Sequence, residues 1–148
     1  MKTAAAILAA LIAFTLGLLS CTPPANSAES TPGVTYSAHV QRIGWQAPVD
    51  DGATAGTTGR ALRVEALRLG ISGGAALSWR GHVQKVGWQS WRDTPAMIGT
   101  TGKALRLEAF QITVKDKGGL YGAVSVEYRA HVQGVGWQPW RRDGQTAG

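Results

Sequence analysis

The chain has 148 residues, a single cysteine and a formal net charge of +6. One cysteine excludes an intramolecular disulfide, so packing alone has to hold the fold together. The modest basic excess favours anionic neighbours such as wall polymers or lipid headgroups, whereas the absence of any run of five or more basic residues argues against nucleic acid as a partner.

The first segment has the pattern of an export signal. Lys2 is followed by an apolar run from Ala4 to Leu19, which is shorter than the roughly 20 apolar residues that span a membrane comfortably. The run ends in Leu18-Leu19-Ser20-Cys21, and these four residues resemble the lipobox of bacterial lipoproteins. Residues 1–20 are therefore predicted to be a lipoprotein signal peptide, with Cys21 as the lipidated first residue of the mature chain. The lipid would anchor the protein in the cell membrane, at its extracytoplasmic face and on the cell surface.

A tether and one domain follow the signal peptide. Residues 21–33 contain the stretch TPPANSAESTPG, which is rich in Pro, Ser and Thr and has no apolar periodicity. Such a composition is typical of a solvated linker. The remaining residues, 34–148, have the size of one small domain, so we expect folded structure to begin at residue 34.

Residues 34–148 contain the same motif three times. Each copy has a histidine, a glutamine two residues later, and a Gly-Trp pair that begins three residues after the glutamine. These residues are His39, Gln41 and Gly44-Trp45 in copy one, His82, Gln84 and Gly87-Trp88 in copy two, and His131, Gln133 and Gly136-Trp137 in copy three. The copies span 34–72, 77–115 and 126–148, and the third stops before the Thr-Thr-Gly and the second strand-like run that the others contain.

Each complete copy contains two runs that are predicted to be strands. Apolar and polar residues alternate over Tyr36–Gln41, and again over Val126–Val132, which is typical of a half-buried strand. The second run, LRVEALRLGI at 62–71, shifts its apolar phase by one residue after Ala66, which predicts a bulge or a bend. A short helix is the alternative, but the corresponding LRLEAFQITV ends in β-branched residues and the flanking glycines leave little room for a helix.

Three copies of such a motif predict an all-β fold with internal pseudo-threefold symmetry, because one copy cannot bury its own apolar face. A β-prism-like and a β-trefoil-like arrangement both fit, whereas a propeller would normally need more blades. The third copy is incomplete at Gly148, and no segment near the N-terminus is expected to supply its missing run. Either the sequence is a fragment of a longer protein, which we prefer, or a sheet edge stays unpaired.

The repeated residues also resemble a known family. The motif reads HVQ-x-[IV]-GW-Q, then DG-x-T-AG, then TTG-[RK]-ALR-[VL]-EA, and it covers nearly everything after the tether. It resembles the clostridial hydrophobic repeat with conserved tryptophan, ChW or hydrophobic W. The resemblance implies an extracellular, noncatalytic module that contacts polysaccharide or other surface proteins and needs no cofactor. Copy two departs from the motif at Thr94-Pro95 and Met97, so a polar-ligand site in its loop is expected to be altered.

Trp45, Trp88 and Trp137 stand beside a glycine at the same position of every copy. Their flat faces could stack on a pyranose ring. A repeated tryptophan next to a glycine is more often a core residue, because the glycine lets another backbone approach closely. We therefore predict that these three rings form the structural repeat core and lock each copy to its neighbour.

Trp91 and Trp140 are expected to behave differently. They occur only in copies two and three, beside Arg92 and Arg141, and Pro48 stands at the corresponding position of copy one. A tryptophan on a variable polar loop is a better platform for a ligand than one in a strand, because binding residues often lie on loops over a rigid scaffold. These two tryptophans are the predicted ligand platforms.

The loop after each Gly-Trp pair supplies further candidates. Asp51 and Thr54 in copy one, and Asp143 and Thr146 in copy three, carry oxygens that could bind the hydroxyls of a ligand. The other interpretation is that the Asp-Gly pairs and the later glycines only set the turns. Both interpretations stay open from the sequence, with the turn slightly favoured.

The ionisable residues of the repeat do not predict catalysis. Three equivalent histidines, His39, His82 and His131, could in principle meet at one metal ion, but a strand histidine is usually only hydrogen-bonded, so no metal is expected. Glu65 and Glu108 could serve a glycosidase, but equivalent positions have similar environments, so we expect them to pair with arginine or histidine on a neighbouring strand. Motifs for a nucleophile, zinc or phosphate are missing from the sequence, and the protein is predicted not to be an enzyme.

The sequence thus predicts a noncatalytic, surface-tethered binding module, for which a cell-wall or extracellular polysaccharide is the preferred ligand. A protein–protein assembly module on the cell surface is the alternative, with the tryptophans turned towards a partner protein. The identity of the sugar or partner and the oligomeric state stay open.

Overall fold

The computed structural model describes residues 9–16, 32–115 and 124–148. Every regular element in these ranges is a β-strand, so the predicted all-β class is confirmed, and the second run of copies one and two is a strand rather than a helix. Among the described residues there is no helix with the length and apolar character needed to cross a membrane.

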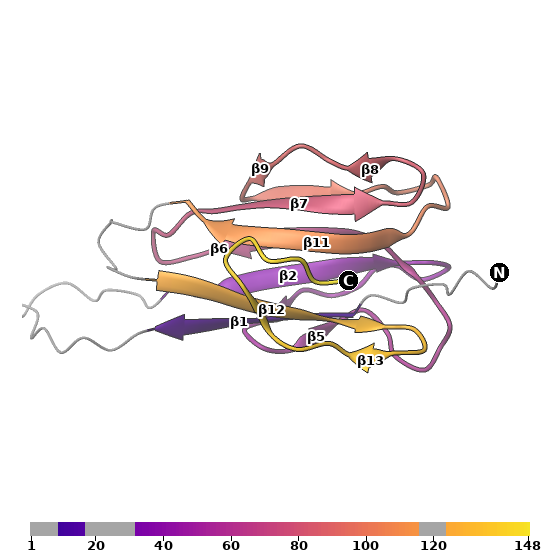
Figure 1. Cartoon of the computed structure of the whole chain (residues 1–148), viewed down its shortest axis with the longest axis horizontal. Helices are drawn as coiled ribbons and strands as arrows, with labels where there is room; N and C mark the ends of the chain where they lie inside the picture. Colours follow the sequence, from indigo (N-terminus) through magenta and orange to yellow (C-terminus); the bar gives the residue numbers. More distant parts are fainter. Residues whose placement is uncertain (1–8, 17–31, 116–123) are drawn as a thin grey trace, which may run out of the picture.

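The strands follow the copies of the sequence (Figure 1). Copy one forms β2 (Val34–Val40), β3 (Gly44–Trp45), β4 (Val49–Asp50), β5 (Thr54–Ala55) and β6 (Val64–Ile71). Copy two forms β7 (Leu77–Val83), β8 (Gly87–Trp88), β9 (Arg92–Asp93), β10 (Ala96–Gly99) and β11 (Leu107–Val114). Copy three forms β12 (Val124–Val132), β13 (Gly136–Trp137) and β14 (Arg141–Arg142), and β1 (Ala9–Leu16) precedes all three copies.

Each copy contributes one antiparallel sheet that is built on a pair of long strands. β2 pairs with β6, β7 with β11, and β12 with β1, while the short return strands pair with the other edge of β2, β7 or β12. The register is the same in all three sheets: Tyr36 is opposite Leu69, Trp79 is opposite Ile112, and Tyr128 is opposite Ile12. One sheet per copy fits the expected pseudo-threefold arrangement.

The loop after each Gly-Trp pair joins the three sheets into a ring. β10 of copy two pairs with β6 of copy one. Ala147 of copy three bridges Phe110 on β11 of copy two, with N–O distances of 2.8 and 3.1 Å in the two directions. β5 of copy one pairs with β1, which is the partner of β12. Each copy therefore covers the second long strand of the preceding sheet.

One continuous apolar core fills the space between the sheets. Three equivalent aromatic side chains, each three residues before a repeat histidine, are at most 2% exposed: Tyr36, Trp79 and Tyr128. Strand alternation turns these rings inward together with every second residue of β2, β7 and β12. Burial of one large apolar side chain contributes about 1.5–3 kcal/mol, so this core replaces the stabilisation that a disulfide would give.

The predicted irregularity in the second run is confirmed as a β-bulge. In copy one, His39 is opposite Ala66 and Val40 is opposite Val64, which leaves Glu65 as the extra residue. In copy two, the same shift lies between Leu107 and Ala109. The bulge explains the change of apolar phase, because one extra residue in a strand moves the following side chains to the other face.

β1 supplies the long strand that copy three lacks, so the expectation that no segment near the N-terminus could do so is wrong. Its 8 residues pair with β12 from Ala9 opposite His131 to Leu16 opposite Val124. β1 fits this place because its backbone pairs with β12 on one side and with β5 on the other, and backbone pairing requires no particular side-chain sequence. The division into residues 1–20, 21–33 and 34–148 stays a prediction, and Cys21 lies outside the described residues.

Candidate functional site

The repeat tryptophans lie on the outside of the sheets. A three-residue turn brings each tryptophan back opposite the repeat histidine. The residue before the tryptophan has a φ of 87°, 86° or 93° in the three copies, a backbone conformation that glycine adopts most easily because it has no Cβ. The two rings then meet edge to face, with centroids 5.3, 5.3 and 5.2 Å apart in the pairs His39–Trp45, His82–Trp88 and His131–Trp137. The geometry is the same in all three copies.

The prediction that these tryptophans plug the core is therefore wrong. Trp88 is 39% and Trp137 is 37% exposed, and Trp45 is half-buried. Cross-strand partners share one face of a sheet, and the repeat histidine alternates with the inward-facing residues of its strand. The tryptophan opposite the histidine must then face outward, and the core position belongs to the aromatic residue three places before the histidine.

An arginine lies between two tryptophans on the outer face of copies two and three. The guanidinium carbon of Arg80 is 4.8 Å from the ring centroids of both Trp88 and Trp91. In copy three, Arg129 is 4.8 Å from Trp137 and 4.7 Å from Trp140. A cation over an indole face contributes about 0.5–1 kcal/mol at an exposed site, so the arginine favours this orientation of both rings.

The predicted platforms are the outermost members of these stacks. Trp91 is 42% and Trp140 is 40% exposed, and each lies just before a short return strand on the outer edge of its sheet. Together with the partly exposed ring on the other side of the arginine, each forms a surface of two indoles. The structure thus brings together two sets of tryptophans that the sequence assigned to different roles.

Copy one builds only half of this arrangement. Ser37 occupies the position of the stacking arginine, and the cation comes instead from Arg68 on the opposite strand, 4.0 Å from the Trp45 ring. Pro48 stands where the second tryptophan would be, and it lines a hollow of about 420 Å³ together with Arg68 and Met97. The first copy therefore offers one ring and an open hollow in place of two rings.

The predicted loop aspartates bond to their own strands. Asp51 Oδ1 accepts from the amide of Val34 at 2.8 Å, and Asp143 Oδ1 accepts from the amide of Val126 at 3.2 Å. Val34 is the first residue of β2 and Val126 is the third residue of β12, so each carboxylate holds its loop against the first part of a long strand. This geometry favours the turn interpretation, and the ligand-binding role of both residues stays a prediction.

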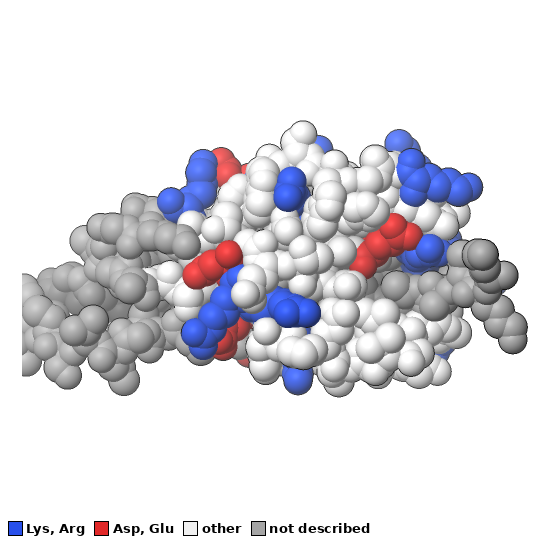
Figure 2. All heavy atoms as spheres, viewed as in Figure 1, with Lys and Arg blue, Asp and Glu red and all other residues white. Residues whose placement is uncertain are grey.

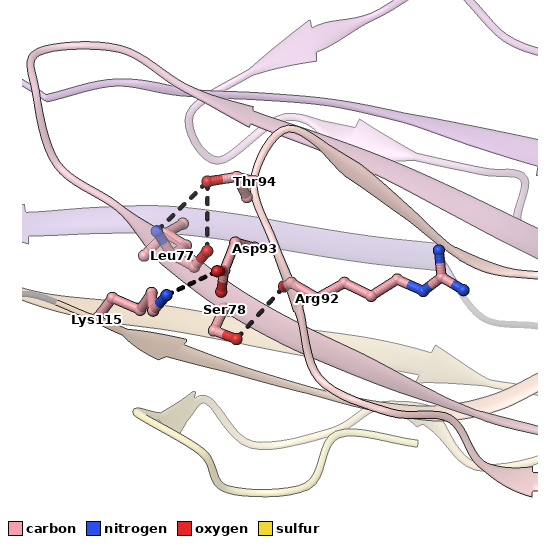
Figure 3. Close-up of polar contacts among 6 residues, drawn as sticks. All are labelled: Leu77, Ser78, Arg92, Asp93, Thr94 and Lys115. Atoms are coloured by element: carbon pink, nitrogen blue, oxygen red, sulfur yellow. Dashed lines mark hydrogen bonds and ion pairs between the residues drawn. The ribbon is translucent and has the colours of Figure 1, made fainter.

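The corresponding loop of copy two uses a hydroxyl instead (Figure 3). Thr94 Oγ1 lies 3.4 Å from the amide and 3.3 Å from the carbonyl of Leu77, and the Ser78 hydroxyl donates to the carbonyl of Arg92 at 3.4 Å. Beside them, Lys115 Nζ is 2.6 Å from Asp93 Oδ2, and this hydrogen bond holds the pKa of the Asp93 carboxyl below its usual range. Although copy two has Thr94 in place of the aspartate, its loop is still hydrogen-bonded to the first residue of β7.

The two predicted loop threonines have different surroundings. Thr146 Oγ1 accepts from Gln111 Nε2 at 2.8 Å, so it links copy three to β11 of copy two. Thr54 is exposed on β5. Neither lies in one of the tryptophan stacks, and their ligand-binding role stays a prediction.

The predicted pairing of the repeat glutamates is confirmed. Glu65 Oε2 is 3.3 Å from Nδ1 of His39 on the neighbouring strand, and Glu65 Oε1 is 2.8 Å from Arg63. Glu108 makes the same two contacts in copy two, at 3.1 Å to His82 and 2.9 Å to Arg106. In the described part of the chain, no three His, Cys, Asp or Glu residues gather where they could hold a metal ion.

The glutamine that follows each repeat tryptophan has a role that the motif alone did not predict. The Oε1 atoms of Gln46, Gln89 and Gln138 accept from the backbone amide of the glycine ten residues later, at 2.8, 2.7 and 2.8 Å. One of these glycines, Gly99, could not be replaced freely, because an added Cβ would lie 2.3 Å from the carbonyl oxygen of Glu65. The signal was present in the sequence, since both residues recur at a fixed spacing in all three copies.

Comparison with known proteins agrees with the repeat. A family model described as "ChW: Clostridial hydrophobic W" matches residues 39–73, 82–116 and 131–148, which is more than half of the chain. Searches of curated proteins and of solved structures return no match. The matched segments include both tryptophan–arginine–tryptophan stacks except for the arginines Arg80 and Arg129, which lie just before them.

Proposed function

The chain belongs to the ChW, or clostridial hydrophobic W, family, and on that basis we propose that it is a noncatalytic, surface-tethered module that binds a cell-wall or extracellular polysaccharide. The repeats of this family are surface-associated modules, and an all-β repeat scaffold fits a noncatalytic role. The polysaccharide and the tether are the two parts of the proposal that require experiments.

The observation that carries the proposal is the pair of exposed double-tryptophan surfaces. An indole offers a flat apolar face to the C–H groups of a pyranose ring, and such a face binds best when its orientation is fixed before the ligand arrives. The stacked guanidinium of Arg80 or Arg129 favours one such orientation. Two such surfaces on two copies could engage one long polymer at two points, which raises the overall affinity without new contacts.

The charges on one face of the molecule favour a polymer ligand of low charge density. On the face shown in Figure 2, basic and acidic side chains lie in small separate groups over a largely uncharged surface. A strongly anionic polymer would be held by an extended basic field. The groups flanking the stacks, Arg92 and Arg141, can instead donate hydrogen bonds to sugar hydroxyls or to single anionic groups.

Replacement of Trp91 and Trp140 by alanine tests this function. Each substitution is expected to weaken retention on the bound glycan about fivefold or more, because a central aromatic contact is typically worth more than 1 kcal/mol. Retention is measured by pull-down on insoluble glucans, chitin and peptidoglycan, with circular dichroism to show that the fold is intact. Val86→Ala and Val135→Ala are the matched controls, since these side chains are 57% and 72% exposed but lie outside the stacks. Unchanged retention by both tryptophan variants would contradict the proposal that these two rings bind the glycan.

A protein–protein assembly module is the second candidate, and one observation favours it. The turn before each Gly-Trp pair exposes an aliphatic side chain in every copy: Ile43 is 44%, Val86 is 57% and Val135 is 72% exposed. Three equivalent apolar residues at the hairpin ends could dock on a partner protein. Replacement of all three by serine is expected to abolish capture of that partner and to leave glycan retention unchanged. This candidate would be favoured if the parent chain bound no glycan and the serine variant lost the partner protein.

The proposed tether is tested separately. Cys21→Ala is expected to abolish incorporation of labelled fatty acid and to release the protein from membranes, because a lipid chain contributes about 0.8 kcal/mol per buried methylene. Membrane retention of the variant would show that another segment anchors the chain. The result leaves the glycan-binding proposal untouched, since the stacks lie in residues 77–148.

A further inference from the structure

The hollow on the outer face of copy one lies where copy one meets copy two. It has a volume of about 420 Å³ and is lined from β2, β6 and the loop of copy two that contains Pro95 and Met97. Ser37 on β2 is opposite Arg68 on β6, and Arg68 is opposite Met97 on β10, so these three side chains form one row across the strands. Pro48 also lines the hollow, from the segment before β4. We call this place the copy-one hollow.

A comparison with copy two explains why the hollow is there. Three outward positions of copy one hold smaller residues than their counterparts in copy two: Ser37 for Arg80, Pro48 for Trp91, and Gly70 for Thr113. In copy two the first two of these side chains stack on one another, with 4.8 Å between the guanidinium carbon of Arg80 and the ring centroid of Trp91. The hollow therefore lies where copy two has a guanidinium and an indole.

Arg68 brings a positive charge to the hollow. The equivalent residue of copy two is Gln111, whose side chain is hydrogen-bonded to Arg80 and Thr146. The cross-strand neighbours of Arg68 are uncharged, and no carboxylate in the described part of the chain forms an ion pair with it. Its guanidinium carbon is 4.0 Å from the ring centroid of Trp45. A guanidinium that stacks through its flat face keeps N–H donors along its edge, so Arg68 can still bind a carboxylate.

The row of residues next to Arg68 contains oxygen atoms instead of a cation. Thr35 lines the hollow two residues before Ser37 on β2, and its Oγ1 donates to Oδ1 of Asp50 at 2.6 Å. Two residues along a strand cover about 7 Å, so this pair lies about that far along the sheet from the row of Arg68. The charges thus favour a ligand with an anionic group at one end and hydroxyl groups at the other.

We propose that the copy-one hollow binds one acidic sugar unit, a pyranose that carries a carboxylate. The carboxylate accepts from the guanidinium of Arg68, the hydroxyls lie towards Thr35 and Asp50, and the C–H groups pack on Pro48 and Met97. A volume of about 420 Å³ is within the range of about 300–1,000 Å³ for small-ligand pockets.

This assignment rests on the proposed function, because the acidic unit would belong to the polysaccharide that the double-tryptophan surfaces bind. Acidic units spaced among neutral ones also fit a polymer of low charge density. The polymer would then contact copy one through charge and copies two and three through stacking.

The direct test is an NMR titration of the full chain with glucuronic acid and with its methyl ester, which has the same ring without the charge. Glucuronic acid is expected to shift the amide resonances of Ser37, Gly70 and Met97 with a Kd of about 1 mM, as for a ligand of this size. The ester should bind about tenfold more weakly or worse, because it loses a hydrogen bond to a charged group. N-acetylmuramic acid, with its carboxylate on a lactyl ether, is the second probe, and the tighter acid identifies where the carboxylate stands on the ring.

Two substitutions introduce residues that copy two already has at the equivalent positions. Arg68→Gln removes the cation and is expected to weaken binding of the acid about tenfold or more. Gly70→Thr should weaken it by a similar factor, because the side chain enters the hollow. A Cβ at position 70 meets only the carbonyl oxygen of Thr35 at 3.8 Å, so the fold should tolerate the change. Arg60→Gln is the matched control, since Arg60 is exposed and does not line the hollow.

Several results would overturn the proposal. Absence of shifts with both acids would remove the site, and equal binding of acid and ester would remove the role of the carboxylate. Full affinity in Arg68→Gln would contradict the assigned contact. If the dipeptide Ala-Ala bound more tightly than either acid, the hollow would be assigned to a peptide carboxylate and not to a sugar.

The same preparations separate this inference from the proposed function. Arg68→Gln is expected to leave retention on neutral glucans and chitin unchanged, and Trp91→Ala and Trp140→Ala are expected to leave the titration unchanged. Retention without binding of either acid would contradict only the copy-one hollow. Binding of an acid without retention would contradict only the tryptophan surfaces.

Discussion

Copies two and three have the same outer surface and different inner partners. Both stack an arginine between two tryptophans, with nearly equal distances, because every residue of the stack comes from the first long strand or from the segment that returns beside it. The second long strand is β11 in one copy and β1 in the other. The stack therefore has the same distances beside either second strand, although in copy two Arg80 also donates to Gln111 on β11 at 2.7 Å.

This difference teaches how a repeat can tolerate an exchanged strand. Backbone pairing and apolar burial accept any extended segment of suitable length, so β1 fits the register of β11. Polar groups are more selective: in copy two, Arg80 and His82 contact Gln111 and Glu108 on the second strand. Packing and backbone pairing are thus common to all three sheets, whereas the polar contacts differ with the second strand.

The largest expected effect comes from the core aromatic residue of either copy. Trp79→Ala is expected to cost about 3–5 kcal/mol, because it leaves a large cavity at the centre of the shared core. Tyr128→Ala in copy three should cost a similar amount if both copies belong to one core. Urea unfolding measures both, and a loss below about 1 kcal/mol for either would show that this copy packs separately.

A smaller effect is expected where one copy meets the next. Gly99→Ala would bring a Cβ within 2.3 Å of the Glu65 carbonyl oxygen at a φ of +90°, and it should cost about 2 kcal/mol or more. Gly102→Ala is the matched control, since its φ is +70° but nothing lies within 4 Å of the added Cβ. Its cost is expected to be about 1 kcal/mol from backbone strain alone. Equal losses of Tm for both variants would show that the contact with β6 is unimportant.

Removal of Glu108 is expected to weaken the polar contacts between the two long strands of copy two. Glu108→Ala leaves His82 and Arg106 without their carboxylate, and the half-buried position predicts a loss of about 1–2 kcal/mol in chemical unfolding. A double-mutant cycle with His82→Ala isolates the pair. A coupling energy near zero would indicate that this contact does not stabilise the sheet.

The smallest expected effect is a difference in alkaline stability. Burial raises the pKa of Tyr128 to about 12, and its hydroxyl accepts from the amide of Ile112 at 3.0 Å. Because the unfolded side chain ionises near pH 10, the contribution of Tyr128 is fully present below pH 10 and is lost as the pH rises towards 12. Tyr128→Phe should flatten Tm over that interval, whereas copy two has Trp79 at this position and should add no such dependence. An unchanged alkaline profile in the variant would contradict this assignment.

Much of the fold follows from the sequence for identifiable reasons. Alternation along Tyr36–Gln41 predicts a strand, and the phase shift after Ala66 predicts the bulge, because both are properties of the local chain. The pairing of Glu65 and Glu108 with histidine and arginine also follows, since the charges recur at equivalent positions. The exposed positions of Trp91 and Trp140 agree with their loop context. Whether they bind a glycan is tested by the retention assay.

What the sequence determines by itself is the existence of three equivalent units, their strands and their turns, because these depend on short-range periodicity and on glycine spacing. The tertiary structure decides which face each tryptophan takes and which strand completes the third sheet. Trp88 faces outward because it is paired with His82 across a turn, and β1 lies beside β12 because its backbone pairs with β12 and with β5. Both outcomes depend on contacts between residues far apart along the chain, and no local pattern contains them.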